Sequence, residues 1–205
     1  MTLHADSEPD ALCHALPRVV SHRGWSRTTP ERVAREAGLE ASEFWNHYRS
    51  LEHCFVAVYD GMVARLARSA TRAVATRATE LGRCAWQEQL DAGIGAVLAF
   101  LSLEPMLART CIVEVLAAGT YARGRRDATL AYFTSQVEGL RFTHGEPIPP
   151  VAAEMIVLGT YAIVFRRVAS GETERLPAVL PDLRRMWLAH VSQATGRPLV
   201  AAPHG

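Results

Sequence analysis

Residues 28–48 read TTPERVAREAGLEASEFWNHY. A helix is predicted to start here, either with Thr29 as the cap and proline at the first helical position, or with Thr28 in a capping box with Glu31. Gly38 ends that helix, and apolar residues recur at helical spacing in the rest of the stretch. We therefore expect two short helices, over residues 30–37 and 41–48, joined by a tight turn. Such a helix-turn-helix can place its second helix in the major groove of DNA.

The second of these helices has two distinct faces. Ala41, Phe44 and Tyr48 fall on one side at helical spacing and are expected to pack inwards. The opposite side carries polar and aromatic residues, namely Ser42, Glu43, Trp45, Asn46 and His47.

Away from this motif the chain is predicted to be helical throughout. It shows no sustained alternation of apolar and polar residues and no Asn-Gly or Asp-Gly hairpin, so strands are not expected. Glycine and proline divide it into about nine helices, which predicts an all-α fold. The helix-turn-helix domain spans residues 1–50, and a helical ligand-binding and dimerisation domain spans 51–205, with helix 51–80 connecting the two. Pro17 predicts that the first helix kinks or starts there, and a seventh helix is expected near residues 129–140.

Composition restricts the class of protein. Of the 205 residues, 49% are hydrophobic and 21% charged, as in ordinary globular proteins. The four cysteines stand singly, and neither a metal-ligand spacing nor a catalytic motif is present, so we expect no metal, no cofactor and no enzymatic activity. There is no signal-peptide pattern, and the apolar run 155–165 is too short to cross a membrane. A cytoplasmic protein is expected.

Three blocks of sequence stand in register around the first motif. They are RGWSRTT at residues 23–29, VAREAGL at 33–39 and FWNHYRSLE at 44–52. They resemble the R-G-Y-x-x-T-T, I-A-x-x-A-G-V and L-Y-x-H-F-x-S-K-E blocks of the TetR family of transcriptional regulators, at the same spacing. The resemblance implies a homodimeric repressor that binds a double-stranded DNA operator and is released from it by a small-molecule effector.

The resemblance also implies roles for individual residues. Either Thr28 or Thr29 matches a usual phosphate contact at the start of the second helix, where a hydroxyl and free backbone N–H groups suit that role. Trp45 stands where a tyrosine usually donates to a phosphate. Asn46 and His47 occupy groove-facing positions, where they are expected to meet base edges, and an asparagine can pair with adenine through two hydrogen bonds. The predicted DNA-contacting residues are Thr28, Thr29, Ser42, Trp45, Asn46 and His47.

Four positions depart from the family pattern. Glu40 replaces the serine cap of the second helix, Ser42 and Glu43 replace the frequent glycine and threonine, and Leu51 replaces a basic residue. Residues 1–60 also carry six arginines against nine acidic residues. The alternative is therefore a helical adaptor or ligand-binding protein with weakened or lost DNA recognition. Local contacts to the DNA backbone remain open to several arginines, namely Arg23, Arg27, Arg32, Arg35 and Arg49.

The C-terminal domain offers candidates for a ligand cavity. They are aromatic or flexible apolar side chains, namely Trp86, Phe100, Met106, Tyr121, Tyr132, Phe133, Tyr161 and Phe165. Because no cluster of cations accompanies them, we expect a mostly hydrophobic small molecule. Glu114 lies in an apolar stretch, where it is expected to pair with an arginine such as Arg109.

The last two predicted helices, over residues 151–169 and 176–194, are candidates for the subunit interface. Paired across a two-fold axis, they would form a four-helix bundle. The residues expected at this interface are Leu158, Phe165, Val179, Leu183 and Trp187. The alternative is that both helices are buried within one chain.

Overall fold

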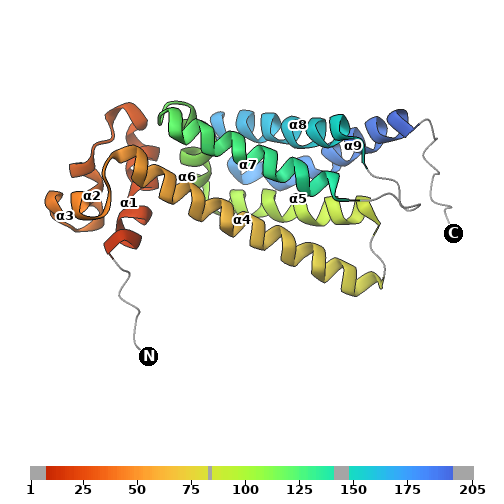
Figure 1. Ribbon diagram of the computed structural model, residues 1–205, viewed down its shortest axis with the longest axis horizontal. Helices are drawn as coiled ribbons and strands as arrows, with labels where there is room; N and C mark the ends of the chain where they lie inside the picture. The colour runs from red at the N-terminus through yellow and green to blue at the C-terminus, as the bar shows by residue number, and fades with distance from the viewer. Residues whose placement is uncertain (1–7, 83–84, 141–147, 196–205) are drawn as a thin grey trace.

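The computed structural model describes residues 8–82, 85–140 and 148–195, with side chains described as far as Trp187. Within these ranges it contains nine α-helices and no strand (Figure 1), so the predicted all-α fold is confirmed. The helices are α1 Glu8–Arg23, α2 Pro30–Ala37, α3 Ala41–His47, α4 Leu51–Leu81, α5 Trp86–Leu103, α6 Pro105–Ala108, α7 Thr120–Glu138, α8 Pro150–Ala169 and α9 Leu180–Thr195. Within the described residues, no single helix is both long and apolar enough to span a membrane.

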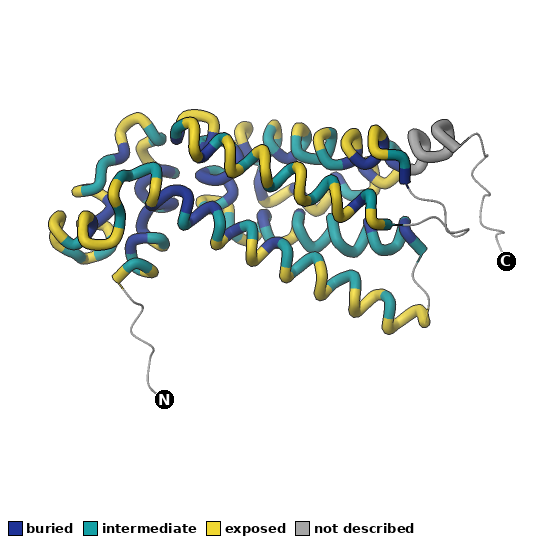
Figure 2. Tube along the Cα trace, viewed as in Figure 1, coloured by how far each residue is buried: buried dark blue, intermediate teal, exposed yellow. Residues whose placement is uncertain are grey.

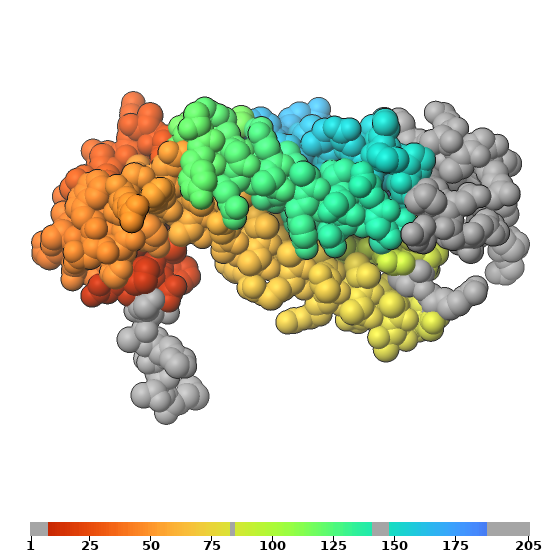
Figure 3. Space-filling view, viewed as in Figure 1, coloured from red at the N-terminus to blue at the C-terminus, as the bar shows by residue number. Residues whose placement is uncertain are grey.

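The helices form an elongated molecule with a small unit at one end. Helices α1, α2 and α3 lie together there, and α5 to α9 form the larger part (Figure 1). Helix α4 runs from the small unit along the larger one, where α7 lies beside it on the face seen in Figure 3. Figure 2 shows that the buried residues of α4 lie in its first half, up to Leu66, whereas every residue of its second half is intermediate or exposed.

The helix-turn-helix begins and ends where local chemistry predicts. Thr29 caps α2 and its hydroxyl accepts the backbone N–H of Arg32 at 3.4 Å. Gly38 follows α2 with φ at 76°, a left-handed conformation that glycine adopts without a steric cost. Helix α1 continues through the buried Pro17, so a start at that residue is wrong. The proline ring has no N–H to donate, which leaves the carbonyl of Cys13 without its usual helical partner.

The segment between α5 and α7 is less regular than expected. A π-helical turn at Arg109–Val113 follows α6, and a 3₁₀ turn at Glu114–Leu116 follows it. Single π-helical turns occur often at functional sites. The expected start of the seventh helix near residue 129 is wrong, because α7 begins at Thr120 and includes Gly124. Its first turn is capped by the Glu52 carboxylate from α4, a contact far away in sequence.

Candidate nucleic-acid interface and ligand cavity

Helix α3 presents a mixed polar and aromatic face to solvent. Phe44 is fully buried and Tyr48 is half-buried, as predicted, whereas Ala41 is exposed and the expectation that it packs inwards is wrong. Tyr48 follows the last residue of the helix, which ends at His47. The side chain of Trp45 is 52% exposed although it is large and apolar. Ser42 and Asn46 are exposed beside it.

The two threonines before α2 have different environments. Thr28 is 6% exposed, and its hydroxyl donates to the carbonyl of Gly24 at 2.9 Å. Thr29 is half-buried at the helix start, where its hydroxyl also bonds the Glu31 carboxylate and lowers the pKa of that group. Of the two alternatives, Thr29 is the residue whose hydroxyl lies nearer the surface.

Two acidic side chains near α3 have structural partners. The Glu43 carboxylate accepts the backbone N–H of Glu40 at 2.6 Å, so it caps the start of α3. Nε2 of His47 lies 2.8 Å from Oε2 of Glu8 on α1. A base contact by His47 therefore has to compete with this neighbouring carboxylate.

A cationic groove of about 350 Å³ lies between α1 and α2. Four guanidinium groups and one carboxylate line it, together with a histidine and a valine: Arg18, Val19, His22, Arg23, Arg32, Arg35 and Glu36. Arg18 donates to Glu36 at 2.8 Å across the groove. The surplus of positive charge suits phosphate groups. Sequence reasoning missed Arg18 and His22, although their spacing with Arg23 on one helix was a usable signal.

A second hollow, of about 770 Å³, lies among α4, α5, α7 and α8. Among the described residues that line it, none is charged. Its apolar wall includes Leu66, Val74, Ile94, Phe133, Val157 and Val164, and its polar groups are hydroxyls and amides: Tyr59, Thr71, Gln89, Thr129, Tyr132, Gln136, Thr160 and Tyr161. Such a cavity favours an apolar ligand that makes a few hydrogen bonds.

The structure brings only part of the predicted ligand set to this cavity. Tyr132, Phe133 and Tyr161 line it, whereas Trp86, Phe100, Met106, Tyr121 and Phe165 do not. Trp86 is buried, Met106 and Tyr121 are exposed, Phe165 is half-buried, and Phe100 lies under the Arg65 guanidinium. Sequence reasoning missed the small residues that make room for the cavity, namely Ala67, Ala70, Ala75, Ala78 and Gly93. The helical spacing of the four alanines along α4 was the available signal, whereas Gly93 lies on α5.

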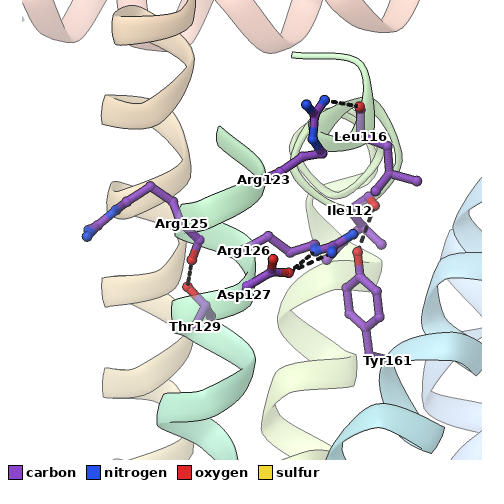
Figure 4. Close-up of polar contacts among 8 residues, drawn as sticks. All are labelled: Ile112, Leu116, Arg123, Arg125, Arg126, Asp127, Thr129 and Tyr161. Atoms are coloured by element: carbon purple, nitrogen blue, oxygen red, sulfur yellow. Dashed lines mark hydrogen bonds and ion pairs between the residues drawn. The ribbon is translucent and has the colours of Figure 1, made fainter. Parts of the chain in front are cut away.

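The cavity has a polar region next to the π-helical turn. Tyr161 donates its hydroxyl to the carbonyl of Ile112 at 3.2 Å, and Figure 4 shows Arg126 beside it. Burial raises the pKa of Tyr161, and the neighbouring Arg126 guanidinium opposes that shift. Nη2 of Arg126 is paired with Oδ1 of Asp127 at 2.6 Å. The π-helical turn is thus bonded directly to a residue of the cavity wall.

The same irregular segment contacts the helix-turn-helix. Oε2 of Glu114 accepts the backbone N–H of Trp25 at 3.1 Å, just before α2. Oε1 of Glu114 lies 3.8 Å from Nη2 of Arg109, which confirms the expected pairing. A chain of bonded groups therefore runs from Tyr161 through residues 112–114 to Trp25.

The predicted interface residues lie in two different environments. Three of them, Val179, Leu183 and Trp187, are at most 9% exposed because they pack within the single chain. For these residues the alternative of burial within one chain is the correct one. Phe165 is half-buried beside Tyr161. Leu158 is 41% exposed, and it shares one face of α8 with two other exposed apolar residues, Val151 and Met155.

Comparison with known proteins shows the fold. No family model matches the sequence, and no curated protein matches it. Among solved structures, the fatty acid degradation regulator FadR of Bacillus halodurans is similar at a TM-score of 0.72 and 15% identity, covering 89% of this chain and 95% of that one. FadR of Bacillus subtilis in complex with stearoyl-CoA is similar at a TM-score of 0.70 and 16% identity, covering 87% of this chain and 97% of that one. A TetR-like transcriptional regulator of Rhodococcus sp. RHA1 is similar at a TM-score of 0.63 and 18% identity, covering 92% of this chain and 99% of that one. The chain has the fold of TetR-type transcriptional regulators, as predicted.

Proposed function

We propose that this chain is a DNA-binding transcriptional regulator, a repressor that a small apolar ligand releases from its operator. One observation carries the proposal: Glu114, on the segment bonded to the cavity wall, also holds the backbone of Trp25 ahead of α2. An exposed helix that fits the major groove and a cavity for a small molecule are thus joined by direct contacts within one fold.

The cavity supports a long aliphatic molecule as the ligand class. Its lining runs along α4 from Tyr59 to Ala78 and carries no charged side chain among the described residues. At 1.5 Å per residue, this stretch of helix is roughly 28 Å long. The FadR protein of Bacillus subtilis, which shares the fold, binds stearoyl-CoA. A fatty acyl chain is therefore a suitable first probe for this cavity.

The exposed apolar face of α8 supports a homodimer. Val151, Met155 and Leu158 are 68%, 46% and 41% exposed, and contact with a second copy would remove them from water. Two copies would present two α3 helices to two half-sites of one operator. The helical stripe at Val179, Leu183 and Trp187 takes no part in this interface, because its residues are already buried.

A second candidate function is that of a helical adaptor with little affinity for DNA. Two observations favour it: the acidic residues Glu40 and Glu43 at the start of α3, and the contact of His47 with Glu8. Acidic groups near phosphates oppose binding, and the effect is largest at low salt.

The deciding experiment measures binding of the purified chain to DNA flanking its own gene, in competition with random DNA. The regulator proposal expects the cognate fragment to bind at least about a thousandfold more tightly than random sequence. Palmitate and palmitoyl-CoA are then titrated against the complex, with a charged metabolite such as citrate as the control. DNA binding without sequence preference, or none, would favour the adaptor.

A further inference from the structure

The end of helix α3 is held against the beginning of α1. Nε2 of His47 lies 2.8 Å from Oε2 of Glu8, the residue at which α1 begins. The next residue, Tyr48, has its hydroxyl oxygen 3.0 Å from Sγ of Cys13, and the hydroxyl donates to the carbonyl of Pro9 at 3.5 Å. The last residue of α3 and the residue that follows it are therefore both bonded to one short stretch of α1.

The contact with Glu8 occupies the tip of the His47 ring. Nε2 lies at the far end of an imidazole, whereas Nδ1 lies next to the main chain, so Nε2 is the nitrogen that would reach a base edge from a helix in the major groove. A neutral ring with its proton on Nε2 donates that proton to the carboxylate, and a charged ring makes the same bond with the help of its charge. In both states Nε2 is engaged, and the side chain of His47 is 27% exposed.

The contact with Glu8 is about as strong as a base contact would be. An exposed ion pair shifts an equilibrium by up to about fivefold, and one hydrogen bond gained in a complex is worth roughly as much. The attachment of Tyr48 fixes the main chain from which the ring extends, so His47 reaches towards DNA only by breaking its bond to Glu8. While Glu8 is present, most of the gain from a base contact by His47 is cancelled.

We propose that Glu8 is a specificity-determining residue, because it keeps His47 away from the base edges and α3 therefore reads DNA without that ring. Ser42 and Asn46, exposed on the same helix, are left to read the bases. The inference rests on the proposed DNA-binding function. The sequence predicted a base contact by His47, whereas here that contact forms only when Glu8 is removed. Loss of the carboxylate should then add a preference at one further base pair for each recognition helix.

The test selects bound duplexes from a randomised DNA library with the full-length chain and its variants. With Glu8→Ala, discrimination at one further base pair should rise by about fivefold. His47→Ala should leave the base preferences of the unaltered chain as they are, and in combination with Glu8→Ala it should remove the added preference. Asp10→Ala, on the same turn of α1, is the matched control. It also removes a negative charge, so it should strengthen binding to random-sequence duplexes to a similar extent without a new base preference.

Two results on DNA would overturn the role of Glu8. One is an unchanged set of base preferences in Glu8→Ala. The other is a loss of preference at one base pair in His47→Ala alone, which would mean that His47 already reads a base. Nitrogen NMR of the free protein tests the contact itself: the Nε2 resonance of His47 should move in Glu8→Ala and stay near its position in Asp10→Ala. An unmoved resonance in Glu8→Ala would show that the carboxylate does not hold the ring.

The same measurements separate this inference from the proposed function. A chain that selects no sequence, unaltered and in every variant, counts against the proposed function and against the specificity role with it, and the NMR result still decides whether Glu8 holds His47. A chain that selects a sequence with preferences that Glu8→Ala does not alter keeps the proposed function and overturns the inference.

Discussion

The Glu52 carboxylate lies where a side chain at position 119 would be, and it fits there because residue 119 is glycine. A Cβ atom at Gly119 would lie 2.1 Å from Oε1 of Glu52, and the backbone there has φ at 135°. The same oxygen accepts the backbone N–H groups of Tyr121 and Ala122 at 2.9 and 3.1 Å. Glu52, the last residue of the third sequence block, thus fixes the start of α7 and with it one wall of the cavity.

Gly119→Ala should therefore lower the free energy of unfolding by about 3 kcal/mol, through backbone strain and the loss of charge-assisted hydrogen bonds. Urea denaturation measures the change. Gly124→Ala is the matched control within α7, where a Cβ meets nothing within 4 Å. That variant should gain about 1 kcal/mol from helix propensity. Equal effects of the two substitutions would show that the Glu52 contact contributes nothing.

Glu43→Gln should strengthen binding to cognate and random DNA alike, and more so at low salt, because a negative charge near phosphates disappears. The amide oxygen can still accept the Glu40 N–H, so stability should change little. Glu43→Ala removes that acceptor and should cost about 1 kcal/mol of stability. Fluorescence anisotropy at two salt concentrations gives the affinities. Loss of cognate binding alone in Glu43→Gln would mean that Glu43 reads a base.

The cationic groove between α1 and α2 predicts a salt effect. If Arg23 and Arg35 contact phosphates, each change to alanine should reduce the slope of log K against log salt by about one, with little change in sequence preference. Arg72→Ala, on the second half of α4, should leave the slope unchanged. Unaltered slopes in Arg23→Ala and Arg35→Ala would place the groove away from the DNA backbone.

Tyr161→Phe should weaken the coupling between ligand and DNA by about fivefold, the size of one hydrogen bond. The ring still lines the cavity, so palmitate affinity should change much less, while more palmitate is needed to displace DNA. Tyr132→Phe, which lines the same cavity without a bond to the π-helical turn, is the control. If both variants release DNA like the unaltered chain, the Tyr161 contact is not part of the coupling.

Leu158→Asp should raise the dissociation constant of a homodimer by at least about tenfold, because it places a charge in the apolar face of α8. Light scattering across a dilution series reports the change. Leu103→Asp is the control, since Leu103 is 81% exposed on α5. A monomer at all concentrations before any substitution would reject the dimer. Trp187→Asp is unsuitable as a test, because Trp187 is buried within one chain and its change threatens folding.

Local chemistry made the helix-turn-helix predictable, whereas long-range packing hid other features. Thr29 and Gly38 mark both ends of α2 through groups next to them in sequence. The start of α7 depends on Glu52, nearly seventy residues earlier, so no local signal at Thr120 could reveal it. A cavity in the C-terminal domain was predicted, and Tyr132, Phe133 and Tyr161 line it, but most of its lining was not, because small residues such as the α4 alanines make the space. The apolar stripe at Val179, Leu183 and Trp187 likewise does not show from sequence whether it packs against the same chain or against a second copy.

The alanines of α4 make the cavity adjustable without any change to the rest of the molecule. Ala67, Ala70, Ala75 and Ala78 line it at successive positions along α4. A single larger side chain at one of them would fill part of the cavity at that position and leave the charged residues and α3 unchanged. If the chain is the proposed regulator, single substitutions at these alanines would change the length of the ligand that fits without any change to α3, so ligand specificity and DNA specificity could evolve separately.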